Sequence, residues 1–239
     1  MKESQRIHIL QNAKEFFKNE IVESHLQGAC KKATKLKSYK INPFLLSYLA
    51  NFLEGNSDSK SIAKALIYPR LLSTSITTIF GNKVQKMIPE IFDDMMGSVV
   101  NGIDIEFTDA IDGRKKYCQL KSGPSTINKD DVVTIVNHFI GVRNLARTNH
   151  LDIRLDDMVV GVLYGEKTEL SHHYKKINEE FPVIVGQEFW HRLTGKKDFY
   201  FDLSAAIGEV ALEVDGTEIL QDAISLLAEE IDKEFPDGL

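Results

Sequence analysis

The sequence has 239 residues, of which 43% are hydrophobic and 27% are charged, and its net charge is −6. This balance excludes a disordered chain, and the length is sufficient to bury a sizeable core. The longest stretch without a charged residue, Ile41–Leu53, is too short to span a bilayer as a helix. We expect a cytoplasmic protein, because the N-terminus lacks an apolar signal segment and Cys30 and Cys118 cannot build a disulfide framework.

The charge is distributed unevenly along the chain. Residues 1–40 contain nine Lys or Arg and four Asp or Glu, whereas residues 198–239 contain one and twelve. A basic end can approach phosphates while an acidic end stays in solvent, so the mild net acidity does not exclude a nucleic-acid partner. The alternative is that both ends are simply solvated helices.

The first part of the chain has helical periodicity, because apolar residues recur at spacings of three and four. Helices are expected from Ser4 to about Lys37, from Pro43 to Leu53, over 59–67 and over much of 71–95. Pro43 suits the first turn of its helix, and Ser57 or Asp58 suits the cap of the next. Pro69 is expected to end the third helix, and Pro89 to end or kink the fourth.

The pattern changes after Gly97 to short apolar runs that are typical of strands. Strands are expected at Val99-Val100, 103–108, 115–121, 158–164 and 183–185. The Asp112-Gly113 turn joins the second and third of these into a β-hairpin. Helices are expected at 129–148, 170–180, 187–193, 201–213 and 217–235. This order predicts an α/β fold in which helices cover a mixed sheet.

The hairpin contains the residues that suit chemistry. Because side chains alternate along a strand, Asp104 and Glu106 share one face, and Gln119 and Lys121 share one face of the next strand. Pairing through the turn places Asp104 across from the neighbourhood of Gln119 and Lys121. Such a set can hold Mg²⁺ and position water for phosphodiester hydrolysis. The alternative is a cross-strand ion pair on a solvated sheet.

At these residues the sequence resembles the PD-(D/E)xK nuclease superfamily, and more closely the PmeII-like type II restriction endonucleases. Further stretches resemble the same family, namely Asn42-Pro43-Phe44-Leu45-Leu46, Ile67-Tyr68-Pro69-Arg70, Ser75-Ile76-Thr77-Thr78 and Val185-Gly186-Gln187-Glu188-Phe189-Trp190. The resemblance implies an α/β, restriction-endonuclease-like mixed sheet flanked by helices. It divides the chain into an N-terminal helical region at 1–79, a nuclease core at 80–200 and acidic C-terminal helices at 201–239.

The resemblance also implies roles for individual residues. Asp104 matches the invariant metal-binding acid, and Lys121 matches the motif lysine. Gln119 stands where the superfamily usually has Glu or Asp, and its amide oxygen can bind a metal without contributing negative charge. The implied cofactor is therefore Mg²⁺, held by Asp104, Gln119 and a further acid, for which Glu90 is the first candidate and Glu106 the second.

The activity implied is cleavage of double-stranded DNA at a short, interrupted palindrome by a homodimer, with a partner methyltransferase acting on the same site. The candidate DNA contacts are Asn137, His138, Arg143, Arg147 and Ser122. The alternative is that the helix residues form a polar outer face and Ser122 belongs to a simple turn. Two other functions stay open: a DNA-binding protein with a degenerate nuclease site, and a helical protein-interaction module.

Overall fold

The structure, a computed structural model, describes residues 1–92 and 97–236. The chain separates into two compact units, each built from segments that are distant in the sequence. The first unit comprises Met1–Phe16 and Lys83–Glu209, and the second comprises Phe17–Asn82 and the chain from Val210 onward. The nuclease core predicted at 80–200 falls largely in the first unit.

Helices account for most of the chain before the sheet. They are α1 (Glu3–Phe16), η1 (Phe17–Val22), η2 (His25–Cys30), α2 (Lys31–Ala33), η3 (Leu36–Ser38), α3 (Pro43–Glu54), α4 (Ser59–Pro69), η4 (Arg70–Ser75) and α5 (Ile76–Ile91). Of these, η1, η2 and η4 are π-helical, and η3 is a 3₁₀ turn. Asp58 caps α4 as predicted, accepting a hydrogen bond from the Ser61 amide at 2.7 Å.

The third helix ends at Pro69 as predicted, but the chain stays helical, because the π-helical segment η4 follows it without a break. Proline lacks the N–H that an α-helix needs at this position, and a wider π turn accommodates that loss. The fourth predicted helix is confirmed as far as Ile91, and the part predicted at 93–95 lies outside the described residues.

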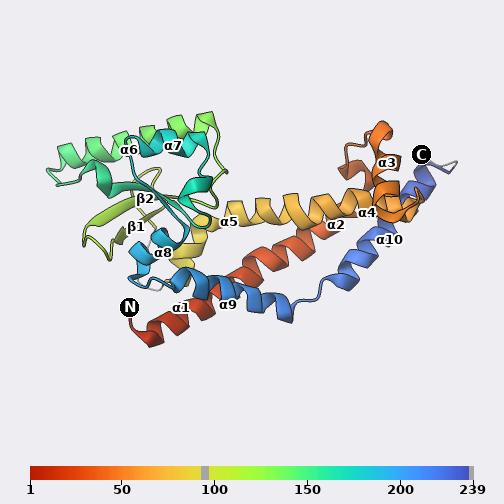
Figure 1. The fold of residues 1–239 in the computed structure, drawn as a ribbon, viewed down its shortest axis with the longest axis horizontal. Coiled ribbons are helices and arrows are strands. Elements are labelled where there is room, and N and C mark those ends of the chain that lie inside the picture. Colours follow the sequence, from red (N-terminus) through yellow and green to blue (C-terminus); the bar gives the residue numbers. More distant parts are fainter. Residues whose placement is uncertain (93–96, 237–239) are drawn as a thin grey trace. The chain divides into compact units, whose positions relative to one another are not determined.

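The sheet has four strands in sequence order: β1 (Ile105–Thr108), β2 (Lys115–Lys121), β3 (Met158–Val162) and β4 (Val183–Val185) (Figure 1). β1 and β2 are antiparallel, and β2, β3 and β4 are mutually parallel. The predicted hairpin is confirmed, and Gly113 has φ 70° in its turn. The strand predicted at Val99-Val100 is wrong, because these residues form a bend and only Gly97 bridges to Ile105.

Helices cover both faces of this sheet, as the sequence predicted for the α/β fold (Figure 1). On one face α6 (Lys129–Thr148) and α7 (His172–Asn178) pack on alternate residues of β3 and on Tyr117 of β2. On the other face α8 (Gly186–Thr194) approaches β3 so closely that a Cβ on Gly161 would lie 2.4 Å from the Phe189 ring. The short segments η5 (Leu155–Asp157) and η6 (Lys167–Glu169) flank β3.

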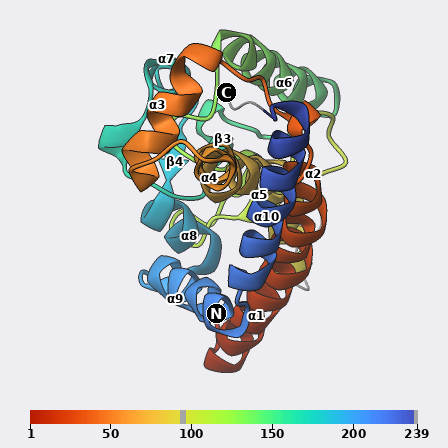
Figure 2. The same cartoon turned by 90° about the vertical axis from the view of Figure 1, so that its right-hand side faces the viewer.

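The last two helices, α9 (Phe199–Glu213) and α10 (Thr217–Glu234), agree with the predicted 201–213 and 217–235. In the second unit α4 packs against both α3 and α10 (Figure 2). Their shared core consists of small and aliphatic side chains, including Leu46, Ala50, Ile62, Ala63, Ile67, Leu71, Ala223, Ile224, Leu227 and Ile231. None of the helices in the described ranges combines the length and apolar composition that crossing a membrane requires.

Candidate active site

The open end of the hairpin brings Asp104 beside Gln119. The Asp104 amide donates to the Cys118 carbonyl at 3.0 Å, and the Leu120 amide donates to Oδ2 of Asp104 at 2.7 Å. These two bonds flank Gln119, so Asp104 lies opposite the first residue of the Gln-x-Lys motif. The register of β1 on β2 therefore agrees with the juxtaposition predicted from the alternation of side chains.

The Asp104 carboxyl is largely removed from water, and burial raises its pKa above the ordinary value. The hydrogen bond from the Leu120 amide opposes this shift, as do the charges of Lys121 and His138. Because the net shift is still upward, the ionised carboxylate is short of favourable partners. A cation bound beside it would stabilise the ionised form.

Gln119 is buried, and its amide has a defined orientation. Nε2 donates to the Gly102 carbonyl and lies 2.5 Å from Nδ1 of His138. When His138 carries its proton on Nε2, the Gly102 carbonyl and Nδ1 of His138 are both acceptors, and each takes one amide hydrogen of Gln119. In the reversed orientation of the amide, Oε1 of Gln119 would face the Gly102 carbonyl oxygen. In the part of the chain that the structure describes, Oε1 is buried without a hydrogen-bond partner. Buried amide oxygens are seldom left so, and this one is suited to a ligand.

Gly102 makes this arrangement possible. Its φ of 80° lies in the left-handed region, which favours glycine. A Cβ at this position would lie 2.2 Å from the His138 ring, so any side chain would displace the histidine from Gln119. This packing could not be predicted from the sequence, because nothing in the spacing of Gly102 and His138 shows that they meet.

Lys121 ends β2 on the same face as Gln119 and is partly buried. Its carbonyl accepts a hydrogen bond from the Leu163 amide at 3.0 Å, which fixes the end of β2 to the residue after β3. Within the described ranges no ion pair joins Lys121 to Asp104, although its charge lowers the pKa of that carboxyl. The hairpin is therefore not closed by the simple cross-strand ion pair considered as the alternative.

The segment after Lys121 is held firmly at this edge of the sheet. The Gly123 carbonyl accepts from the Tyr174 hydroxyl at 3.1 Å and from the Thr126 hydroxyl at 2.9 Å. Ser122 is partly buried, and its carbonyl accepts from the Tyr164 amide at 3.3 Å. These contacts keep the backbone around Ser122 in place next to the end of β2.

The two further acids make no hydrogen bond or ion pair with this cluster among the described residues. Both carboxylate oxygens of Glu106 are engaged, one by the Ser98 hydroxyl and one by the Lys115 ammonium, each at 2.5 Å. Burial alone would raise the pKa of Glu106, but these two contacts outweigh it and lower the pKa. Glu90 is exposed near the end of α5, and within residues 1–92 and 97–236 no hydrogen bond or ion pair joins it to Asp104 or Gln119.

The candidate DNA contacts on α6 fall into two sets. His138 points inward to Gln119, whereas Asn137 is exposed on the rim of a groove that the same histidine helps to line. Arg143 and Arg147 are exposed on the following turns, and Arg143 lies 4.0 Å from Glu180. α6 therefore carries both the exposed polar side chains and the histidine that contacts Gln119 of the hairpin.

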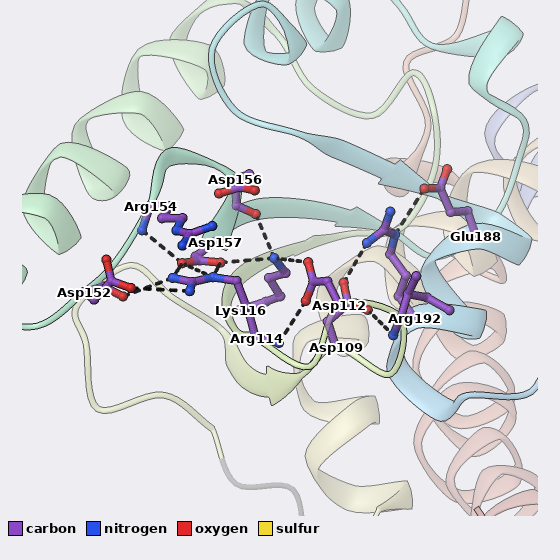
Figure 3. Close-up of polar contacts among 11 residues, drawn as sticks. Asp109, Asp112, Arg114, Lys116, Asp152, Arg154, Asp156, Asp157, Glu188 and Arg192 are labelled. Atoms are coloured by element: carbon purple, nitrogen blue, oxygen red, sulfur yellow. Dashed lines mark hydrogen bonds and ion pairs between the residues drawn. The ribbon is translucent and has the colours of Figure 1, made fainter.

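A separate buried charge network lies at the turn end of the hairpin (Figure 3). Lys116 is 2% exposed and contacts Asp112 at 2.7 Å and Asp157 at 3.1 Å. Arg114 also binds Asp157, through Nε at 2.9 Å. Because Lys116 is near the start of β2 and Gln119 near its end, this network supports the turn and is distinct from the candidate site.

The oxygen donors at the hairpin end fit Mg²⁺. Within residues 1–92 and 97–236 no group of three or more His, Cys, Asp or Glu side chains gathers around one point. Mg²⁺, however, takes carboxylate and carbonyl oxygens and keeps several waters, so one carboxylate and one amide oxygen can form part of the protein contribution. Asp104 offers the carboxylate, and Gln119, which lies opposite it in the hairpin, offers an Oε1 that has no hydrogen-bond partner among the described residues.

The mixed sheet, with helices on both faces and polar groups at the end of its antiparallel hairpin, has the restriction-endonuclease-like α/β architecture. Residues 7–215 match the family model described as type II restriction endonuclease EcoO109I. Since this match spans well over half of the chain, the protein belongs to that family of type II restriction endonucleases. No curated protein matches the chain.

Family membership indicates type II cleavage of DNA in general and confirms the predicted class of nuclease. The narrower PmeII-like grouping, the Gln-x-Lys form of the motif and the roles of individual residues stay predictions.

Proposed function

We propose that this protein is a Mg²⁺-dependent, site-specific endonuclease that cuts double-stranded DNA at a short, interrupted palindrome, and that the hairpin end is its active site. The observation that carries the assignment is that Oε1 of Gln119, opposite Asp104 in the hairpin, is buried without a hydrogen-bond partner among the described residues. An orphaned acceptor next to a desolvated acid is unfavourable in isolation and favourable around a cation. The PmeII-like resemblance adds the expectation of an interrupted palindromic site.

Asp104 and Gln119 would hold Mg²⁺, which when bound supplies Lewis-acid polarisation of a phosphoryl oxygen. The Leu120 amide fixes Oδ2 of Asp104, and the Gly102 carbonyl and His138 fix the amide of Gln119. Lys121 positions and activates the attacking water and offsets charge that develops on the phosphate. His138 acts through Gln119, so its proposed role is positioning.

Gln119 brings no negative charge, and a further acid is needed to balance the cation. We assign this role to Glu90, with Glu106 as the alternative. One oxygen of Glu106 already binds the Ser98 hydroxyl and the other binds the Lys115 ammonium. Binding a cation through Glu106 would therefore break these two hydrogen bonds. Glu90 is exposed, and in the described part of the chain no hydrogen bond or ion pair would have to break for its carboxylate to bind a cation.

The DNA contacts are assigned to the exposed polar side chains of α6 and to the segment after β2. Arg143 and Arg147 suit phosphate oxygens, Asn137 suits a base edge or phosphate, and Ser122 suits a phosphate next to the catalytic lysine. A palindromic site calls for a two-fold homodimer in which each copy reads one half-site and cuts one strand. A methyltransferase that modifies the same sequence is the expected partner.

The test is digestion of unmethylated plasmid and phage DNA by the purified protein with Mg²⁺ and with EDTA. We expect discrete fragments only with Mg²⁺, and we expect Lys121→Ala to cut at least about 10²-fold more slowly. Lys196→Ala is the matched control, because Lys196 is exposed and lies at the other end of the hairpin from Lys121. It follows Gly195, which lies beside Ala110 at the turn end. Normal cutting by Lys121→Ala would refute the site, and an unchanged rate in Glu90→Ala would move that role to Glu106.

The neutral Gln119 also favours a second candidate, a DNA-binding protein of the same fold with a degenerate site. Such a protein would bind duplex DNA without metal, and its affinity would fall steeply with salt concentration. A folded protein that shifts a labelled duplex in a gel yet leaves DNA intact at every Mg²⁺ concentration would select this candidate.

A further inference from the structure

The helix α3 presents its apolar surface to solvent. Six of its large hydrophobic side chains are exposed, namely Phe44, Leu45, Tyr48, Leu49, Phe52 and Leu53. Only Leu46 and Ala50 of this helix are buried, where they pack in the core shared with α4 and α10. An amphipathic surface helix normally has the opposite arrangement, with its widest apolar stripe toward the core.

The exposed face is well formed. Asn42 caps the N-terminus by accepting from the Phe44 amide at 3.1 Å, Pro43 occupies the first turn, and Gly55 ends the helix in the left-handed conformation. The exposed residues follow two i, i+4 rows, so they make one continuous stripe. The rings of Tyr48 and Phe52 pack on each other with centroids 6.0 Å apart. This stripe, which we call the α3 face, is therefore a preorganised surface.

The size of the α3 face matches a protein interface. Phe44 is 90% exposed, Tyr48 62% and Phe52 80%. With about 200 Å² for each aromatic side chain, these three alone expose roughly 450 Å². The three partly exposed leucines extend the surface toward the roughly 800 Å² that each partner buries in a standard interface. Monomeric proteins seldom expose an apolar patch of this extent.

The charge of the α3 face favours a second copy of the same chain. No Asp, Glu, Lys or Arg occurs from Ile41 to Leu53, so two such faces can meet around a two-fold axis without like charges opposing each other. Glu54, at the end of the helix, is already paired with Lys64 at 2.5 Å. The absence of basic residues from this run also makes it a poor surface for DNA phosphates.

We infer that the α3 face is the surface through which two copies of this chain associate, by packing α3 against its symmetry mate. The inference rests on the proposed function for the need of two copies, since a palindrome presents two equivalent half-sites. It goes further by assigning the contact to six named side chains on one helix of the second unit.

Sedimentation velocity of the full chain, without DNA and without metal, tests the inference. We expect the wild type to be a dimer at micromolar concentration and Phe52→Glu to raise the dimer dissociation constant at least 100-fold. Leu212→Glu is the matched control, because Leu212 is 88% exposed on α9 and should leave the constant unchanged. Phe44→Glu repeats the test at the other end of α3, in case one variant fails to fold by circular dichroism.

A wild type that stays monomeric, or a folded Phe52→Glu variant that dimerises like the wild type, would overturn the inference. A monomer that co-floats with vesicles of phosphatidylcholine and phosphatidylglycerol would assign the α3 face to a lipid surface and overturn it as well. A wild-type dimer that Phe52→Glu dissociates, but that does not cut DNA, would support this interface while contradicting the proposed function. Mg²⁺-dependent DNA cleavage by a protein that stays monomeric would contradict this interface while supporting the proposed active site.

Discussion

Gln119 is the residue at which the candidate site departs from a pair of acids, and the structure shows what the glutamine contributes. Its amide nitrogen serves two acceptors, the Gly102 carbonyl and His138, and a carboxylate would instead repel the Gly102 carbonyl. Its oxygen has no hydrogen-bond partner among the described residues. The substitution therefore exchanges one negative charge for a fixed orientation of the donor oxygen.

Replacing this residue by the acid that the superfamily usually carries should destabilise the fold without metal. In Gln119→Glu a carboxylate oxygen would face the Gly102 carbonyl, and that carbonyl would lose the amide that donates to it. We expect the free energy of unfolding to fall by about 1–3 kcal/mol. Urea unfolding in EDTA measures this difference. Equal midpoints for variant and wild type would show that the Gly102 contact is not important for stability.

His138 is expected to tune the metal site from outside it. Removing a group that orients a metal ligand typically weakens metal affinity by about 10–100-fold, so His138→Ala should raise the dissociation constant for Mn²⁺, used as a spectroscopic substitute for Mg²⁺, by that factor. Electron paramagnetic resonance of free Mn²⁺ reports binding independently of cleavage. His138→Gln retains an acceptor and should recover part of the affinity, whereas Asn137→Ala, on the exposed neighbour, should not change it.

At the scale of single elements, the hairpin is held at both ends by different chemistry. The open end carries the uncompensated Asp104 and Gln119, whereas the turn end carries the buried Lys116, Asp157 and Arg114 network (Figure 3). Asp157 is buried, which by itself would raise its pKa, but hydrogen bonds from Arg114, the Arg154 amide and Lys116 lower the pKa well below its usual range. The turn end is thus electrostatically satisfied and the open end is not.

This network predicts a pH dependence of stability. Because the folded-state pKa of Asp157 lies below the unfolded value of about 3.9, its contribution is complete above about pH 5 and is lost as the pH falls toward the folded pKa. Asp157→Asn should lower the free energy of unfolding at pH 7 by about 3–5 kcal/mol and flatten its decline between pH 5 and pH 3. Asp156→Asn, on the exposed neighbour, is the control, and a slope equal to that of the wild type in Asp157→Asn would contradict the prediction.

At the scale of the whole molecule, two copies acting on one palindrome should divide the work by strand. A dimer that contains one wild-type copy and one Lys121→Ala copy has one competent site, so it should convert supercoiled plasmid to the nicked circle and stop there. Co-purification through two different affinity tags isolates this mixed dimer. Linear product at the wild-type rate would show that one copy cuts both strands and would reject this division.

The sequence alone determined the helices, the hairpin and the class of the protein. Apolar periodicity, the Asp112-Gly113 turn and the alternation along two strands act over a few residues, so Asp104 could be placed across from Gln119 before any tertiary contact was known. The local rule for proline placed the end of α4 at Pro69 but did not show that a π-helical segment continues from it. Local rules failed at Val99-Val100, where β-branched residues form a bend.

Only the tertiary structure decided how Gln119 is held, which face of α3 is exposed and where the buried charges lie. His138 approaches Gln119 from a helix that follows it by many residues, and Lys116 meets Asp157 across two strands. α3 has apolar residues on nearly every side, so its pattern did not show which of them pack on α4 and which stay in solvent. These features depend on contacts between distant segments, whose distances and orientations are set by packing and are not encoded in the spacing of residues along the chain.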